Sequence, residues 1–132
     1  MNKENLTEQK LEHHRKEINR LDGEIVQLLN KRISHAVGIG EIKQRDGQEI
    51  YAPHREKEVF DRIKSMNQGP VKDASLCAIY REMMSAALAL QKTLVVAYLG
   101  PEATFTHQAA LKRFGSSLTY LPLKTVADVF TE

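Results

Sequence analysis

The sequence predicts an all-α domain of three helices, one of them very long, followed by an incomplete α/β segment. Three observations lead to this prediction. Residues 7–43 contain no proline, and their apolar residues recur at intervals of three and four, which is the period of an amphipathic helix. Two shorter stretches with the same period follow, at about 53–66 and 73–92. At Thr93 the pattern changes to a continuous apolar run, which is typical of a buried parallel strand.

The first helix is predicted from about Thr7 to Lys43, with Asn5 or Thr7 as its N-cap. It is expected to end within residues 44–49, where the sequence RDGQ is typical of a turn. Its apolar side holds Leu11, Ile18, Leu21, Ile25, Leu28, Leu29, Ala36, Ile39 and Ile42. Two short helices cannot cover an apolar side of this length, so we expect a homodimer to complete the core.

The second helix is predicted to begin at Pro53, because proline is favoured at the first helical position. The residues Asn67 to Pro70 are expected to end it near Met66. The third helix carries an apolar stripe of Leu76, Ile79, Tyr80, Met83, Ala86, Ala87 and Leu90. Gln91 lies about three turns after Tyr80 and continues this stripe. Its amide is therefore either exposed by fraying or directed into a site.

The last forty residues are predicted to form one β-α-β unit and the start of a further helix. The predicted elements are a strand at 93–99, a helix at about 107–114, a strand at 118–121 and a helix from about 125 to 130. Two strands cannot hold an α/β domain together. We therefore expect residues 1–92 to be one domain and residues 93–132 to be a fragment of a second, truncated one.

The composition limits the class of function. The chain is 42% hydrophobic and 27% charged, with a net charge of +2. These values are normal for a soluble globular protein and do not indicate a nucleic acid or a membrane surface as partner. The N-terminal residues contain no apolar run of the kind found in a signal peptide. A cytoplasmic location is therefore expected.

The sequence contains no pattern that predicts a metal or an organic cofactor. Its five histidines and its one cysteine, Cys77, do not have the spacing of metal ligands. The pair of glycines at Gly38 and Gly40 lies inside a predicted helix rather than after a strand, so it is not a nucleotide-binding fingerprint. These glycines either allow another helix to approach closely or leave room for a ligand.

Three cations lie on the helix face that should be buried. Steps of three and four along the first helix connect Arg15, Arg32 and Lys43 through mostly apolar positions. An unpaired buried cation is costly. One interpretation is that each side chain lies at a helix end, extends to solvent or pairs with Asp22 or a glutamate. The other is that the three side chains bind an anionic ligand.

The distances along the helix favour a site shared between two copies of the chain. At a rise of about 1.5 Å per residue, Arg32 and Lys43 lie roughly 16 Å apart along the axis, and Arg15 and Lys43 roughly 42 Å. Arg32 and Lys43 could reach one small ligand, but Arg15 of the same helix could not. If Arg15 belongs to the site, it comes from a second helix that runs antiparallel in a two-fold dimer.

Four sequence segments together resemble known families. HRKEINRLDGEIVQLLNKRISHAVGIGEIK, PHREKEVFDRI and AIYREMMSAALALQ resemble the all-helical chorismate mutases, over about residues 10–92. VVAYLGPEATFTHQAALKRFG resembles the opening of prephenate dehydratase, over residues 94–132. The order resembles that of the bacterial bifunctional chorismate mutase–prephenate dehydratases. The resemblance implies an intertwined antiparallel homodimer that acts in phenylalanine biosynthesis.

The resemblance also implies roles for individual residues. Arg15 of the partner and Arg32 would bind the two carboxylates of chorismate. Lys43 would contact a carboxylate and the ether oxygen, and Gln91 would donate a hydrogen bond to that oxygen. Arg55 would support the carboxylate site. These assignments follow from matched positions in this sequence.

Three further positions belong to the implied site. Glu56 would accept a hydrogen bond from the ring hydroxyl of the substrate. Ala52 and Ala87 stand where the family often has aspartate and serine. The main-chain amide at Ala52 could still reach the substrate, and one contact at Ala87 would be missing or replaced by water. These departures bear on the affinity for the substrate more than on the type of reaction.

The implied reaction converts chorismate to prephenate by an intramolecular rearrangement, which needs no nucleophile, metal or cofactor. The site must hold the reactive conformer and stabilise the negative charge that develops on the ether oxygen. The sequence leaves two alternatives open: a helical module that binds an anionic metabolite without converting it, and a non-catalytic dimerisation domain. Dehydratase activity is not expected, because the catalytic residues implied by that family would follow residue 132.

Overall fold

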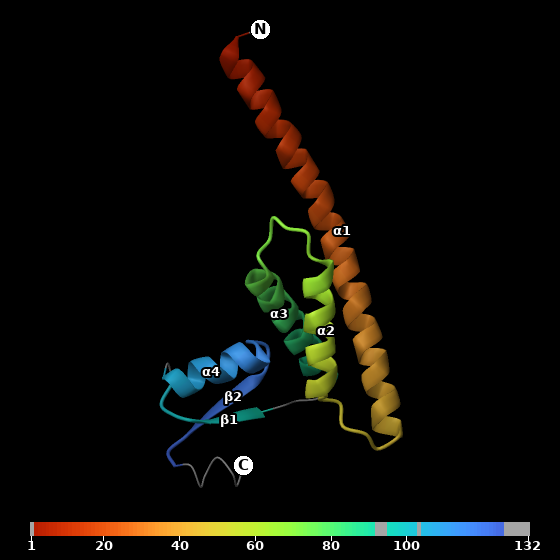
Figure 1. Ribbon diagram of the computed structural model, residues 1–132, viewed down its shortest axis with the longest axis vertical. Helices are drawn as coiled ribbons and strands as arrows, with labels where there is room; N and C mark the ends of the chain where they lie inside the picture. The colour runs from red at the N-terminus through yellow and green to blue at the C-terminus, as the bar shows by residue number, and fades with distance from the viewer. Residues whose placement is uncertain (1, 92–94, 103, 126–132) are drawn as a thin grey trace. The chain divides into compact units, whose positions relative to one another are not determined.

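The computed structural model describes residues 2–91, 95–102 and 104–125. Within these ranges the elements are α1 (Lys3–Arg45), α2 (Pro53–Met66), α3 (Asp73–Gln91), β1 (Val95–Leu99), α4 (Phe105–Phe114) and β2 (Thr119–Leu123) (Figure 1). The chain divides into two compact units, residues 1–32 and residues 33–132.

The helices follow the predicted pattern closely, except at the start of α1. The bounds of α2 are those predicted, and α3 ends at Gln91; the predicted last residue, Lys92, lies outside the described residues. The predicted N-cap of α1 at Asn5 or Thr7 is wrong. The helix begins at Lys3, because the Asn2 side chain accepts a hydrogen bond from the Asn5 amide at 2.9 Å. The Thr7 hydroxyl instead donates to the Lys3 carbonyl.

The core of the unit at residues 33–132 lies partly between α2 and α3. Val59 and Ile63 of α2 are 5% and 2% exposed, and Ala87 of α3 is 3% exposed. These positions agree with the predicted apolar sides of the two helices. Met66, predicted on the same side of α2, is 59% exposed, because it is the last residue of the helix.

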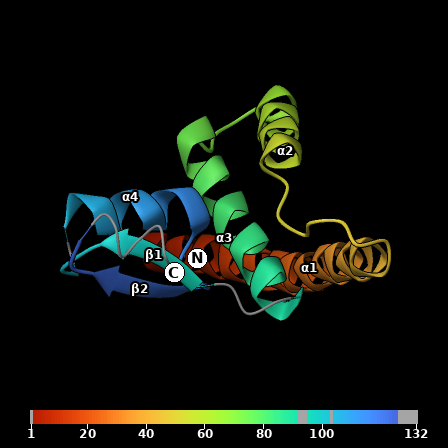
Figure 2. The same cartoon turned by 90° about the horizontal axis from the view of Figure 1, so that it is seen from below.

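The β-α-β unit is present in the predicted order. β1 and β2 pair in parallel, with Val95 opposite Thr119 and Leu99 opposite Leu123, and α4 packs against β1 (Figure 2). The helix begins two residues earlier than predicted, because the Thr104 side chain caps it by accepting from the His107 amide. The second strand begins and ends slightly later than predicted. The helix predicted at 125–130 lies outside the described residues from 126 onwards.

The hydroxyl group of Tyr120 connects β2 to α4. The hydroxyl donates to the Ala110 carbonyl within α4 at 3.3 Å and lies close to the carbonyl of Gly115, the C-cap residue of that helix. Burial raises the pKa of Tyr120 above its usual value, and the negative charge of Glu82 raises it further. Both effects keep the phenol neutral in the folded chain.

The raised pKa predicts a loss of stability at alkaline pH. Since the folded-state pKa lies above the unfolded one, the contribution of Tyr120 is complete below about pH 10 and is lost as pH rises through the folded value. We expect the ultraviolet titration of this phenol to lag behind that of a free tyrosine. Tyr120→Phe should remove its part of the alkaline loss of stability in urea unfolding. An unchanged pH dependence in that variant would contradict the prediction.

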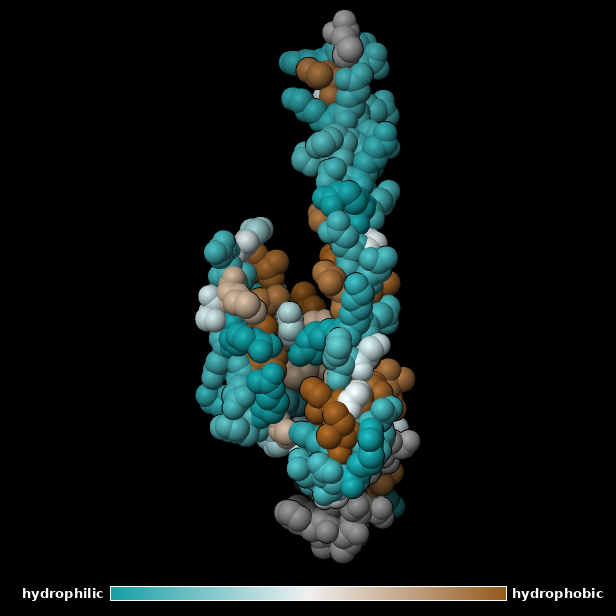
Figure 3. Space-filling model, turned by 90° about the vertical axis from the view of Figure 1, so that its right-hand side faces the viewer, coloured by the Kyte–Doolittle hydropathy of each residue, from teal (hydrophilic) through white to brown (hydrophobic). Residues whose placement is uncertain are grey.

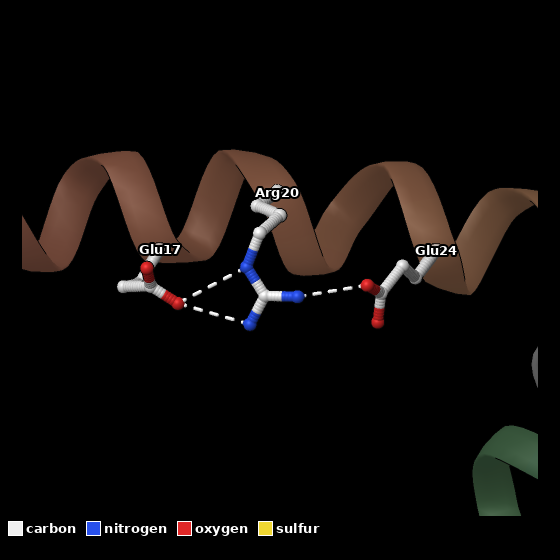
Figure 4. Close-up of polar contacts among 3 residues, drawn as sticks. All are labelled: Glu17, Arg20 and Glu24. Carbon is white, nitrogen blue, oxygen red and sulfur yellow. Dashed lines mark hydrogen bonds and ion pairs between the residues drawn. The ribbon is translucent and has the colours of Figure 1, made fainter.

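The unit at residues 1–32 is a helix with many apolar side chains exposed in the single chain. Ile18, Ile25 and Leu28 are 55%, 59% and 63% exposed. Apolar side chains, brown in Figure 3, stand among hydrophilic ones along α1. Arg20 lies between Glu17 and Glu24, at 2.9 and 2.7 Å from their carboxylates (Figure 4). Such exposed pairs stabilise a helix by only about 0.2–0.5 kcal/mol each.

Candidate active site

Gly40 of α1 and Gln91 of α3 lie in close contact. Gly40 is buried, and a Cβ atom at this position would overlap Gln91 Oε1 and lie 2.7 Å from Gln91 Cδ. The Gln91 side chain therefore lies directly against the α1 backbone, and its Nε2 donates to the Ala87 carbonyl at 3.0 Å. Of the two interpretations of Gln91, the structure supports a side chain directed inward. It also explains Gly40, which leaves room for that side chain.

Lys43 lies three residues after Gly40, on the same side of α1. Its side chain is half-buried in the single chain. Lys43, which carries an ammonium group, thus lies about one helical turn along α1 from the glycine against which the Gln91 amide packs. This combination can stabilise negative charge on an oxygen atom of a bound molecule.

Glu56 has a partner that the helical periodicity does not predict. The Arg81 Nη1 donates to Glu56 Oε1 at 2.6 Å, and the two side chains are only 15% and 16% exposed. The Arg81 guanidinium also lies 4.4 Å from the centre of the Phe60 ring. The position of Arg81 beside the apolar stripe of α3 could have suggested a buried cation, but not its partner on another helix. The pair fixes the Glu56 carboxylate in one orientation.

Arg55 and Ala52 are placed differently from each other at the start of α2. Ala52 is the N-cap residue, and its carbonyl accepts from the Glu56 amide at 3.1 Å. The Arg55 side chain is 59% exposed and pairs with Glu58 at 3.1 Å. In the single chain Arg55 is therefore not brought to the Glu56 carboxylate. Its predicted support of a substrate carboxylate stays a prediction.

Arg15 and Arg32 lie in the unit at residues 1–32, and Lys43 and Gln91 lie in the other unit. Arg15 is exposed and Arg32 is half-buried in the single chain. Their convergence with Lys43 on one ligand therefore stays a prediction. No group of three or more histidine, cysteine, aspartate or glutamate side chains could hold a metal ion among the residues that the structure describes. Within the same residues, no helix has both the length and the hydropathy needed to cross a bilayer.

Comparison with known families decides the identity of this fold. The family model described as chorismate mutase type II matches residues 14–92. The chain belongs to the type II chorismate mutase family. A second family model, described as prephenate dehydratase, matches residues 96–132. The family predicted from the sequence is confirmed, and so is the order of the two segments.

Relatives of this chain carry both names in their description. The bifunctional chorismate mutase/prephenate dehydratase of Aquifex aeolicus is 49% identical over 128 residues, which are 94% of this chain and 35% of that protein. The protein of the same name from Neisseria gonorrhoeae is 44% identical over 119 residues, which are 90% of this chain and 32% of that protein. The chain thus spans about a third of the length of these relatives.

Two further relatives are named chorismate mutase alone. The chorismate mutase of Methanocaldococcus jannaschii is 34% identical over 85 residues, which are 64% of this chain and 86% of that protein. The solved structure of chorismate mutase, form II, from Thermus thermophilus superposes with a TM-score of 0.61 at 30% identity. It covers 62% of this chain and 93% of that one. The predicted mutase fold is therefore confirmed at the level of a mostly helical chain with a small two-stranded sheet.

Proposed function

We propose that the chain catalyses the conversion of chorismate to prephenate. In this rearrangement the ether C–O bond breaks while a C–C bond forms in the same molecule, so no proton, electron or group is exchanged with the protein. The observation that carries the proposal is the packing of Gln91 against Gly40, about one turn from Lys43. The match of the mutase family to residues 14–92 supports it.

The proposed site works by positioning and by charge. Arg32, together with Arg15 of a second copy, binds the two carboxylates, because the guanidinium fork suits a carboxylate. Lys43 and Gln91 donate hydrogen bonds to the ether oxygen as negative charge develops on it. Glu56, held by Arg81, accepts a hydrogen bond from the ring hydroxyl. Holding the chain of chorismate over its ring removes much of the entropic barrier.

The proposed assembly is an antiparallel homodimer formed along α1. The large apolar side chains of this helix are mostly exposed in the single chain, among them Ile18, Ile25, Leu28, Ile39 and Ile42. Burial of apolar surface stabilises a complex by roughly 25 cal/mol per Å². A second copy of α1 would cover this surface and would bring Arg15 to the partner's Lys43 end. The dimer then holds two equivalent sites.

The direct test of the proposed function is the consumption of chorismate by the purified chain, with prephenate identified as the product. Rapid conversion by a dimer is the expected result. Saturable binding of chorismate without conversion would instead favour the second candidate, a module that binds an anionic metabolite. The observation that favours this candidate is the presence of three cations on one face of α1, Arg15, Arg32 and Lys43, which could bind an anion without catalysis.

Mixing two inactive variants tests the shared site. Arg15→Ala and Lys43→Ala each remove one group from every site of their own homodimers. In a mixed dimer, one of the two sites has both groups intact. At random mixing we expect about a quarter of the wild-type activity to return, since about half of the dimers are mixed and each holds one intact site.

The control for this experiment mixes Lys43→Ala with the double variant Arg15→Ala/Lys43→Ala, which leaves no intact site in any dimer. Native mass spectrometry reports the fraction of mixed dimers. If mixed dimers are present and activity does not return, Arg15 does not complete the partner's site.

A further inference from the structure

The turn between α4 and β2 is bound tightly to α3. The Ser116 amide donates to both carboxylate oxygens of Glu82, at 3.0 and 3.1 Å, and the Ser116 hydroxyl donates to the same group at 2.6 Å. One carboxylate thus receives three hydrogen bonds from a single residue. Hydrogen bonds to an ionised acceptor are stronger than those between neutral groups.

A second contact lies beside the first. The Ser117 amide donates to Ser85 Oγ at 3.1 Å, and Ser85 is only 3% exposed. Gly115 has a φ angle of +80°, and a Cβ atom there would lie 2.5 Å from Ser85 Cβ and 3.3 Å from the Arg81 carbonyl. The two backbones therefore approach so closely that only glycine fits without a shift.

These contacts connect residues matched by different families. Glu82 and Ser85 lie within the chorismate mutase match, and Gly115 to Ser117 lie within the prephenate dehydratase match. The rings of Tyr51 and Phe114 add a further contact, with centroids 5.7 Å apart. All of these residues belong to the same compact unit, residues 33–132.

The contact reaches the proposed mutase site through Arg81. The Arg81 carbonyl faces Gly115, while its guanidinium pairs with Glu56 at 2.6 Å. Glu82, the next residue along α3, holds Ser116. The turn therefore restrains the stretch of α3 that orients the Glu56 carboxylate.

We propose that Glu82 and Ser85 form an interdomain latch with Gly115, Ser116 and Ser117, and that the latch positions Arg81 and thereby Glu56 for binding chorismate. The positioning role rests on the proposed function, whereas the docking itself does not. Glu56 is a group that contacts substrate, and the latch residues are positioning residues. Two strands alone give little independent stability, so the latch also holds the α/β segment on the helices.

The experiment compares Glu82→Ala with the conservative Glu82→Gln, which keeps one acceptor oxygen. Asp61→Ala is the matched control, because it removes an exposed carboxylate of α2 that pairs with Lys57 and does not touch the turn. Hydrogen exchange of the Ser116 and Ser117 amides, followed by NMR on the whole chain, reports the latch. Chorismate kinetics report the positioning.

Glu82→Ala should speed exchange of the two amides and raise KM by about two- to thirtyfold, which is the range for mutations that act on a site through other residues. The value of kcat should change less than about twofold, because a hydroxyl contact made equally in substrate and transition state affects KM alone. Glu82→Gln should be intermediate, and Asp61→Ala should match wild type. Gly115→Ala breaks the same contact from the other side and should raise KM by a similar factor.

Fast exchange of both amides in the wild-type chain would overturn the latch. If Glu82→Ala and Gly115→Ala speed the exchange of both amides but leave KM unchanged, the positioning role is wrong. If the wild-type chain does not convert chorismate while its two amides are protected and Glu82→Ala releases them, the proposed function and the positioning role fail and the docking stands.

Discussion

Replacing Lys43 by alanine is expected to lower kcat/KM for chorismate by about 100- to 1,000-fold, which is the usual cost of removing one preorganised donor to a developing oxyanion. Most of the loss should fall on kcat, because the charge on the ether oxygen grows only as the transition state forms. The neutral amide of Gln91 would remain as the second donor. Its hydrogen bond alone cannot replace an ammonium group.

Helicity must be measured on the same sample, by circular dichroism. Alanine is a better helix former than lysine, so the helix content should be retained. Lys31→Ala is the matched control, because Lys31 is an exposed lysine of the same helix and the charge change is identical. Parallel loss of helicity and activity in Lys43→Ala would favour the non-catalytic dimerisation domain instead.

Replacing Gly40 by alanine should have the second largest effect, although the residue contributes no functional group. The added Cβ would occupy the position of the Gln91 amide, and a displacement of about 1 Å at a reacting centre can cost up to about 100-fold in rate. We expect kcat to fall by about 10- to 100-fold. The free energy of unfolding should change little, since the gain of about 1 kcal/mol in helix propensity offsets the loss of the Gln91 hydrogen bond to the Ala87 carbonyl.

Gly38→Ala is the matched control, because a Cβ atom there has nothing within 4 Å in the single chain. It should gain the same helix propensity and keep full activity. The double variant Gly40→Ala/Gln91→Ala tests the route of the effect. If Gly40 acts only through Gln91, the double variant should be no slower than Gln91→Ala, which is a non-additive result. Full activity in Gly40→Ala would show that Gln91 does not act from the observed position.

The sequence predicts the helices well because their ends carry strong signals. As predicted, α2 begins at Pro53 and ends at Met66, just before the residues that stop the helix. The sequence does not predict the start of α1, because the capping group, Asn2, lies before the first apolar residue of the periodic stretch. Periodicity shows which side of a helix is apolar. It does not show which residue caps the helix, because capping depends on the local geometry of the backbone.

The candidate site could be predicted only in part, for a related reason. The helical period shows that Lys43 and Gln91 continue apolar faces, but not which side chains meet across elements. Arg81 and Glu56 are separated by 25 residues, and Ser116 and Glu82 by 34. The residue types alone allowed several partners for each charge. Only the packing of α2, α3 and α4 chooses among them.

The close approach of Gly115 to Ser85 bears on how far this protein is modular. The match to the mutase family ends at residue 92. Residues on the two sides of this boundary are nevertheless in contact, and a Cβ atom at Gly115 would have no room beside Ser85. A chimera that joins residues 1–92 to an unrelated second domain would leave Glu82 and Ser85 without their main-chain donors. The part of the chain that can be transferred with its contacts intact is therefore longer than residues 1–92. A chimera would also need to include the Gly-Ser-Ser turn.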